Sequence, residues 1–155
     1  MAPTDPIESF EPELAERRFD EADALIVLDT SNQQRIGRLA PLLDRHVIPI
    51  AVVDHHVSHV NGFGQVNVVE PEASSTGEIV YELIREAGGE ITAATAEALY
   101  VALMTDTGSF RYSNTDSHAH RMAAELLGSR LDPQKIHSQV HSHATAGACA
   151  SSARC

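Results

Sequence analysis

Three separated segments of the sequence carry carboxylate or imidazole side chains of the kind that binds metal ions. An aspartate follows each of two apolar runs, two histidines follow the second of these aspartates, and a third aspartate precedes a Thr-Gly pair. Carboxylates and imidazoles without a thiolate suit a divalent cation such as Mn²⁺ or Mg²⁺ rather than structural zinc. One carboxylate can bridge two such ions about 3.5–4 Å apart, an arrangement that hydrolyses phosphoesters. The residues concerned are Asp29, Asp54, His55, His56 and Asp106.

Each of these signals also has an ordinary structural explanation. An aspartate after a strand most often forms an Asx-turn or caps a helix, which applies to Asp29. A His-His pair is more often a turn or a hydrogen-bonded surface feature than a ligand pair. Asp106, followed by Thr107 and Gly108, fits simple turn chemistry. The combination of all three segments is much rarer by chance, and it favours a metal site.

The two apolar runs, residues 24–28 and 47–53, are predicted to be strands. Neither run alternates with polar residues, which is typical of strands buried on both faces of a parallel sheet. Pro49 weakens the early part of the second strand or places that strand at an edge. Ligands of parallel sheets bind at the carboxyl ends of the strands, where Asp29 and Asp54 lie.

Helices are predicted where capping residues precede apolar residues at helical spacing. The strands and helices together predict an α/β fold with a parallel, Rossmann-like sheet. The predicted helices begin after Asn32, at the Ser74–Glu78 segment, at Thr92 and at Ser117. The second of these helices is predicted to end at Gly88-Gly89 and the fourth at Gly128.

Composition divides the chain into three parts. Residues 1–23 form a polar lead-in with room for a short helix at 11–17, and residues 24–136 form the folded domain. Residues 137–155 contain one bulky apolar residue in nineteen positions. Such a segment cannot bury enough apolar surface to order itself, so we expect a disordered tail.

Net charge narrows the classes of partner. The 155 residues include 22 acidic and 11 basic side chains, for a formal net charge of -11. Such a surface repels phosphate backbones and disfavours binding to duplex nucleic acid, but it allows a small phosphorylated substrate held by metal ions.

Both cysteines lie in the last seven residues, and neither a signal peptide nor an apolar run of membrane-spanning length is present. We therefore expect a cytoplasmic protein without a membrane partner.

Longer motifs add a specific resemblance. Asp54-His55-His56, directly after Val52-Val53, resembles the name-giving motif of the DHH phosphoesterase superfamily. Residues 71–78 and 105–112 resemble the subfamily of oligoribonucleases that also act on 3′-phosphoadenosine 5′-phosphate, and the likeness extends over residues 22–140. The resemblance implies a metal-dependent phosphoesterase that hydrolyses short oligoribonucleotides or nucleoside 3′,5′-bisphosphates. It also implies two Mn²⁺ (or Mg²⁺) ions in the intact site.

The resemblance also implies roles for individual residues. Asp29 would bridge both metal ions, and His55 and Asp106 would complete the second site. Asp54 would orient an imidazole from behind, and His56 would face the substrate phosphate. The first three are therefore the expected metal ligands, and the other two are the expected catalytic residues.

Three further residues are candidates for binding the substrate, which would be short single-stranded RNA or a nucleotide. Arg111 could bind a phosphate, although a salt bridge to an acidic surface group is an equal alternative. Ser75 and Thr76 could donate to a phosphate from a helix N-terminus, with ordinary helix capping as the alternative. A homodimer of the intact protein is a further partner consistent with the resemblance.

The sequence departs from the family pattern at both ends. Family members begin with a strand and a His-x-Asp-x-Asp element that supplies the first metal site, and none precedes Asp29. They also continue into a smaller C-terminal domain that binds substrate. We therefore expect a domain truncated at the N-terminus and lacking the C-terminal substrate domain, with an open sheet edge, weak Mn²⁺ binding and little or no activity.

Other functions stay open at this point. Within the same superfamily, the alternatives are hydrolysis of a cyclic dinucleotide or of pyrophosphate or polyphosphate. An alternative of another class is a non-catalytic module that binds a phosphate or a nucleotide. Asp106→Ala separates the two classes: metal-dependent turnover should vanish for an enzyme, whereas ligand affinity should barely change for a metal-free binder.

Overall fold

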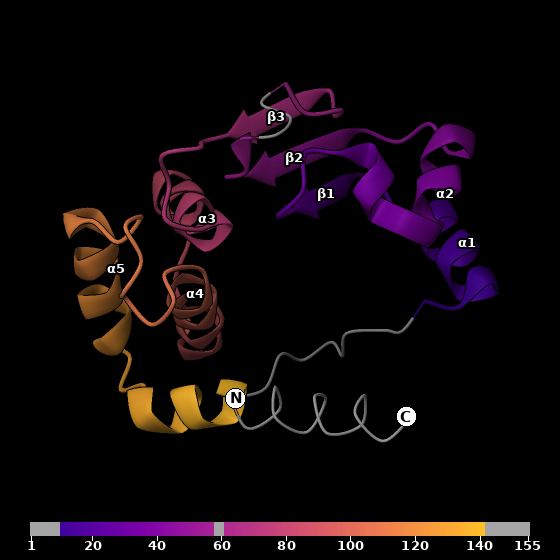
Figure 1. Cartoon of the computed structure of the whole chain (residues 1–155). Helices are drawn as coiled ribbons and strands as arrows, with labels where there is room; N and C mark the ends of the chain where they lie inside the picture. Colours follow the sequence, from indigo (N-terminus) through magenta and orange to yellow (C-terminus); the bar gives the residue numbers. More distant parts are fainter. Residues whose placement is uncertain (1–9, 58–60, 142–155) are drawn as a thin grey trace, which may run out of the picture.

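The computed structural model describes residues 10–57 and 61–141 of the chain (Figure 1). Its elements alternate between strands and helices in the first part and are all helical in the second. In chain order they are α1 (Pro12–Glu21), β1 (Leu25–Leu28), the 3-10 helix η1 (Gln33–Leu39), α2 (Ala40–Arg45), β2 (Ile50–Asp54), β3 (Val66–Val69), α3 (Thr76–Glu86), α4 (Ala93–Asp106) and α5 (Ser117–Leu127), followed by a helix over residues 133–141.

The three strands form a parallel sheet in the order β1-β2-β3, which confirms the predicted α/β fold. The central strand β2 buries Val52 and Val53. It begins directly after Pro49, whose ring nitrogen cannot donate to the sheet, so Pro49 shortens the strand rather than placing it at an edge. The pairings Leu28↔Val53 and Asp54↔Val69 align the carboxyl ends of all three strands.

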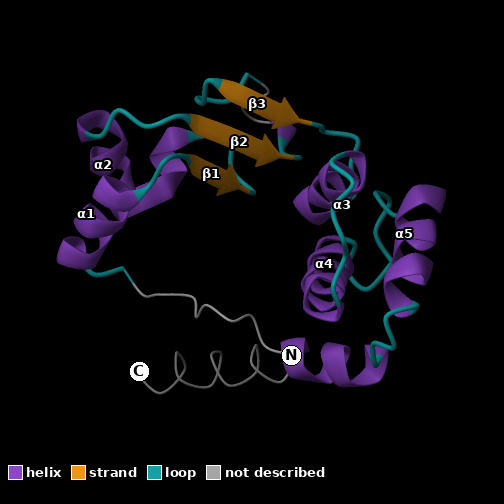
Figure 2. Ribbon diagram, turned by 180° about the vertical axis from the view of Figure 1, so that it is seen from behind, coloured by secondary structure: helices purple, strands orange, loops and turns teal. Residues whose placement is uncertain are grey.

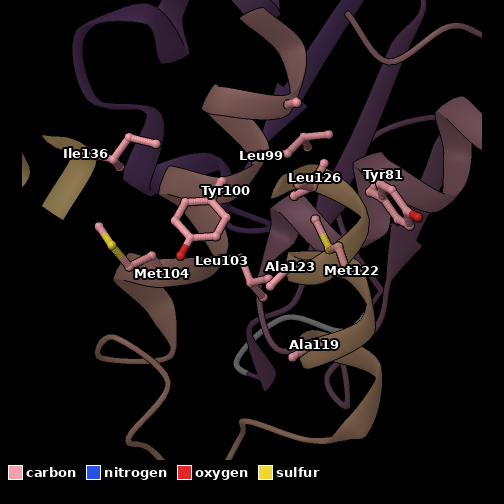
Figure 3. Close-up of a cluster of buried hydrophobic side chains, with 11 residues drawn as sticks. Tyr81, Leu99, Tyr100, Leu103, Met104, Ala119, Met122, Ala123, Leu126 and Ile136 are labelled. Carbon is pink, nitrogen blue, oxygen red and sulfur yellow. The ribbon is translucent and has the colours of Figure 1, made fainter. Parts of the chain in front are cut away.

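The main apolar core lies between α3, α4 and α5 (Figure 3). α4 is the central helix of this core, and side chains from α3 and α5 pack against it. Ser75, Thr92 and Asp116 cap the three helices by accepting hydrogen bonds from backbone N–H groups of the first turn, and Ser75 lies in the segment predicted to cap a helix. No helix in the described residues is long and apolar enough to cross a membrane.

The N-terminal part of the chain is more ordered than the expected lead-in. The described residues before residue 24 include α1, which buries Phe19 in a second apolar cluster with Leu42 of α2. The Asn32 side chain accepts a hydrogen bond from the Gln34 N–H at 2.9 Å, as a capping residue should. The predicted helix after it forms as two short 3-10 pieces separated by a kink at Gly37, whose φ of 66° is not helical.

The predicted tail is corrected in its first residues. Residues 137–141 belong to the helix over residues 133–141, so the expected boundary at residue 136 falls inside a helix. Ile136 is buried in the main core and Val140 packs against it, one helical turn later. One apolar pair at i, i+4 is a weak pattern in sequence, but it is enough to dock a short helix on an existing core. The rest of the expected tail, with both cysteines, lies outside the described residues.

The outer edge of β1 leads to a prediction about self-association. Within the described residues β1 pairs only with β2, as Figure 2 shows, and its Ile26 is 66% exposed. An open apolar edge strand is a template for pairing with another chain. We expect the protein to self-associate as its concentration rises, and Ile26→Lys to lower the apparent mass measured by light scattering. Val47→Lys places the same charge on a fully exposed loop residue and should leave the mass unchanged; an equal decrease in that control would contradict this explanation.

His118 links α5 to α3 and makes stability depend on pH. Its Nδ1 lies 2.9 Å from a Glu78 oxygen and its Nε2 lies 3.0 Å from a Glu82 oxygen. Burial lowers the pKa of His118, but the hydrogen bond and charge of Glu78 and the charge of Glu82 outweigh it and raise the pKa above its ordinary value. The protonated His118 therefore stabilises the folded state fully below about pH 6.5, and this stabilisation is lost as the pH rises through the raised pKa that His118 has in the folded state.

We expect His118→Gln to remove this pH-dependent stabilisation, which for a partly exposed ion pair amounts to at most about 1 kcal/mol. Urea unfolding at pH 6 and at pH 8.5 measures it: the difference between wild type and variant should be larger at pH 6. His120→Gln is the matched control, because the His120 ring stacks on Phe110. A wild-type advantage that grows with pH would have the wrong sign and would contradict the assignment.

Candidate metal centre

Three segments that are distant in sequence meet at the carboxyl end of the sheet. Asp29 follows β1, and its backbone N–H donates to the Val53 carbonyl oxygen at 3.0 Å, which places it beside the end of β2. Asp54 ends β2 and is followed by the two histidines, while Asp106 is the last residue of α4. The parallel register thus places acidic side chains of two neighbouring strands at one edge, and α4 adds the third.

The distances between the side chains suit a shared cation. His55 Nε2 lies 3.8 Å from Asp29 Oδ1 and 3.6 Å from Asp106 Oδ2. His56 Nδ1 lies 4.0 Å from the same Asp29 oxygen. One ligand atom from each of Asp29, His55 and His56 fits within 4.8 Å of the others. His55 thus lies close to both of the other expected ligands, Asp29 and Asp106, but the compact group of three contains His56 in place of Asp106.

The orientation of His55 is fixed from the side away from the carboxylates. Its Nδ1 lies 3.2 Å from the Ala73 carbonyl oxygen in the loop between β3 and α3. Because a carbonyl oxygen only accepts hydrogen bonds, Nδ1 carries the proton and donates. The lone pair is then on Nε2, which is the nitrogen that faces Asp29 and Asp106. His55 is thus prepared to act as a ligand through Nε2.

Asp54 lies behind His56 and holds its imidazole ring. The fully buried carboxylate of Asp54 lies 2.7 Å from His56 Nδ1 and also accepts the His56 backbone N–H at 3.2 Å. Burial raises the pKa of Asp54, but the nearby Ser31 hydroxyl and the contacts with His56 outweigh it and lower the pKa to about 2. Asp54 is therefore ionised, and His56 donates to it through Nδ1.

The remaining polar atoms around Asp54 are tightly enclosed. Ser31 Oγ and Asp54 Oδ2 are both buried, and neither has a hydrogen-bond partner of normal geometry among the described residues. With its own carboxylate buried, Asp54 can act on the site only through His56.

Asp106 and Asp29 form an acidic pair at the site. Burial raises the pKa of the Asp106 carboxyl group, the Asp29 charge raises it further, and His55 and His56 oppose both effects. Two neighbouring carboxylates of which one is partly desolvated repel each other unless a cation lies between them. The charge arrangement therefore fits a divalent cation as well as the distances do.

Two of the expected substrate contacts are corrected. Ser75 is fully buried, and its hydroxyl oxygen accepts the Glu78 N–H as the N-cap of α3. Thr76 donates its hydroxyl to Asp29 Oδ1 at 2.8 Å rather than presenting it to a ligand. The capping alternative therefore applies to Ser75, and Thr76 acts inside the site.

Arg111 belongs to a sharply bent loop that starts next to Asp106. Gly108, Ser109 and Phe110 all have left-handed backbone angles. The exposed Arg111 donates through Nε to the Gly108 carbonyl oxygen at 2.7 Å, which ties the side chain to its own loop. No ion pair of Arg111 with an acidic group is present in the described part of the chain, so the salt-bridge alternative is not seen there.

Several supporting contacts were not predicted from the sequence. The Ala73 carbonyl that orients His55 belongs to the backbone, so no residue type in the sequence indicates this contact. Asn114 donates to the carbonyl oxygens of both Ser74 and Asp106, and so joins the start of α3 to the end of α4. Its position in the Ser-Asn-Thr-Asp segment reads only as turn chemistry.

Comparisons with known proteins agree with this geometry. Residues 4–103 match the family model described as "DHH family, N-terminal domain". A bifunctional oligoribonuclease and PAP phosphatase NrnA from Thermus thermophilus is 34% identical over 125 residues, covering 81% of this chain and 34% of that protein. The protein of the same description from Bacillus subtilis is 30% identical over 128 residues, covering 78% of this chain and 38% of that protein.

Among solved structures, an exopolyphosphatase-related protein from Bacteroides fragilis superimposes with a TM-score of 0.79 at 30% identity, over 84% of this chain and 38% of that one. The parallel sheet, with acidic and imidazole side chains at the carboxyl ends of its strands, is an α/β domain with a candidate metal centre. The chain belongs to the DHH family, a family of phosphoesterases. It spans about a third of the length of the curated relatives just described.

Proposed function

We propose that this chain forms the metal-binding domain of a phosphoesterase that hydrolyses short oligoribonucleotides or nucleoside 3′,5′-bisphosphates. The observation that carries the proposal is that His55 Nε2 lies within 3.8 Å of carboxylate oxygens of both Asp29 and Asp106 at one edge of the sheet. The likeness to two bifunctional oligoribonuclease and PAP phosphatase proteins supports the nucleotide substrate.

The donor atoms suit Mn²⁺ or Mg²⁺. The site offers carboxylate oxygens from Asp29 and Asp106 and an imidazole nitrogen from His55, which are ligands that these cations accept. When bound, such an ion lowers the pKa of a coordinated water and neutralises charge on phosphoryl oxygens. The same proposal includes a second ion, to which Asp29 would also contribute its carboxylate.

The catalytic roles that we propose follow from hydrogen bonding. Asp54 accepts a hydrogen bond from the Nδ1–H of His56 and so fixes the tautomer, which leaves His56 Nε2 to bind a phosphoryl oxygen or to transfer a proton. The His56 side chain is half-buried and accessible to a ligand. Arg111 lies on the loop that follows Asp106 and supplies a positive charge for a phosphate of the substrate.

A second candidate is the hydrolysis of polyphosphate. It is favoured by the structural likeness to an exopolyphosphatase-related protein, which has a TM-score of 0.79 at 30% identity. The two candidates differ in what the substrate offers besides phosphate, because only a nucleotide has a base and a sugar. Release of phosphate from polyphosphate, with none from 3′-phosphoadenosine 5′-phosphate, would favour this second candidate.

The test of the proposal is titration of the chain with Mn²⁺ by calorimetry, followed by hydrolysis assays with and without EDTA. We expect weak Mn²⁺ binding and slow, EDTA-sensitive cleavage of a diribonucleotide at high protein concentration. Two tight sites would contradict the expected weak binding. Absence of any binding at millimolar Mn²⁺ would overturn the metal site itself.

A further inference from the structure

Thr76 is tied to the candidate metal centre by a contact that the proposed mechanism does not use. It is the first residue of α3, is almost fully buried, and donates its hydroxyl to Asp29 Oδ1 at 2.8 Å. A carboxylate only accepts hydrogen bonds, so the direction of this bond is fixed. The accepting atom is the same Asp29 oxygen that lies closest to His55 and His56.

Helix capping does not account for the Thr76 hydroxyl. The N-cap of α3 is Ser75, whose hydroxyl accepts the Glu78 N–H. The start of α3 is also held rigidly, because a Cβ on Gly77 would lie 2.8 Å from the Ala102 Cβ of α4. The close approach of the two helices fixes Thr76 relative to α4, the helix that carries Asp106.

Asp29, in contrast, is the least constrained of the candidate ligands. Its side chain is 59% exposed, and its backbone has a φ of 65°, a left-handed conformation that residues other than glycine adopt only occasionally. An exposed carboxylate on such a residue is free to rotate unless a neighbour holds it. The Thr76 hydroxyl is the one side-chain donor bonded to it, apart from the histidine contacts, among the described residues.

We infer that Thr76 is a positioning residue that holds the Asp29 carboxylate in the orientation needed to bind a divalent cation together with His55. The inference rests on the proposed function, because it gives Asp29 the role of a metal ligand. It differs from the role expected for Thr76 from the sequence, which was a direct contact with the substrate phosphate.

The test compares Thr76→Val, which keeps the shape of the side chain and removes the donor, with Thr76→Ser, which keeps the donor. Mn²⁺ alone is the probe, and affinity is measured by calorimetry on the full chain. We expect Thr76→Val to weaken binding at least tenfold, as loss of a ligand-orienting partner does, and Thr76→Ser to stay within about twofold of wild type. Thr95→Val is the matched control, because the Thr95 hydroxyl bonds to Thr92 on the first turn of α4.

Urea unfolding of each variant shows whether the fold is kept, and Thr76→Ala replaces Thr76→Val if the latter does not fold. Wild-type affinity in the variant without the hydroxyl would overturn the inference and leave the proposed function intact. A loss of affinity in Thr76→Ser as large as in Thr76→Val would overturn it as well. Absence of Mn²⁺ binding by the wild type would instead overturn the proposed function, on which the inference rests.

Discussion

Asp106→Asn is expected to weaken Mn²⁺ binding by at least tenfold and to abolish metal-dependent phosphoester hydrolysis. The change keeps the size of the side chain and removes the charge. Asp106 Oδ2 lies 3.6 Å from His55 Nε2, so its loss leaves a single carboxylate, Asp29, beside the imidazole. Loss of a partner that only orients a ligand already costs 10- to 100-fold in affinity, and a direct ligand should cost at least as much.

Calorimetry with Mn²⁺ and an EDTA-sensitive hydrolysis assay measure the two effects. Asp44→Asn is the control, because Asp44 is an aspartate of α2 that bonds to Gln33 rather than to the histidines. If Asp106→Asn leaves the binding of 3′-phosphoadenosine 5′-phosphate unchanged in the presence of EDTA and wild type shows no turnover, the chain is a metal-free binding module instead.

The ends of the strands could be predicted from the sequence because two independent patterns coincide there. A run of apolar residues indicates a buried parallel strand, and parallel strands bring their carboxyl ends to the same edge. Asp29 and Asp54 were therefore expected at the same edge, and they lie close together because β1 pairs directly with β2. The position of Asp106 did not follow from this rule, because it depends on how α4 packs; the family resemblance supplied it.

The hydrogen bonds that orient the side chains of the site could not be predicted from the sequence, for a physical reason. The bond from Thr76 to Asp29 joins residues 47 positions apart, and the Ala73 carbonyl that orients His55 belongs to the backbone. Hydrogen bonds of this kind depend on side-chain directions and on the distance between elements, which residue type and spacing do not encode. For the same reason Ser75 and Thr76 read alike in the sequence, although one caps a helix and the other reaches a carboxylate.

At both ends of the chain a short helix docks on the fold through very few apolar side chains. Composition predicts order from the average content of apolar residues, but one or two well-placed side chains decide whether a short helix docks. Phe19 anchors α1, and Ile136 anchors the helix over residues 133–141. In each case the surrounding residues are polar, because only one face of the helix meets the core.

The core that these helices share also positions the candidate metal centre. Asp106 ends α4, and α4 keeps its place by packing against α3 and α5 (Figure 3). Leu103, one turn before Asp106, is fully buried at the centre of this packing. The carboxylate therefore stays near His55 only as long as the apolar contacts behind it are filled. Stability of the helical core and geometry of the site are thus coupled through a single helix.

Leu103→Ala is accordingly expected to lower the free energy of unfolding by about 2–5 kcal/mol, because it removes buried methyl and methylene groups and leaves a cavity that tight packing cannot close. For a domain of ordinary stability that is a large fraction of the total. Urea unfolding monitored by circular dichroism measures the change. Leu83→Ala is the matched control: Leu83 is 43% exposed on α3, and the same truncation there should cost less than half as much. Equal costs at the two positions would show that α4 is not the centre of the core, and the coupling between packing and the position of Asp106 would have no basis.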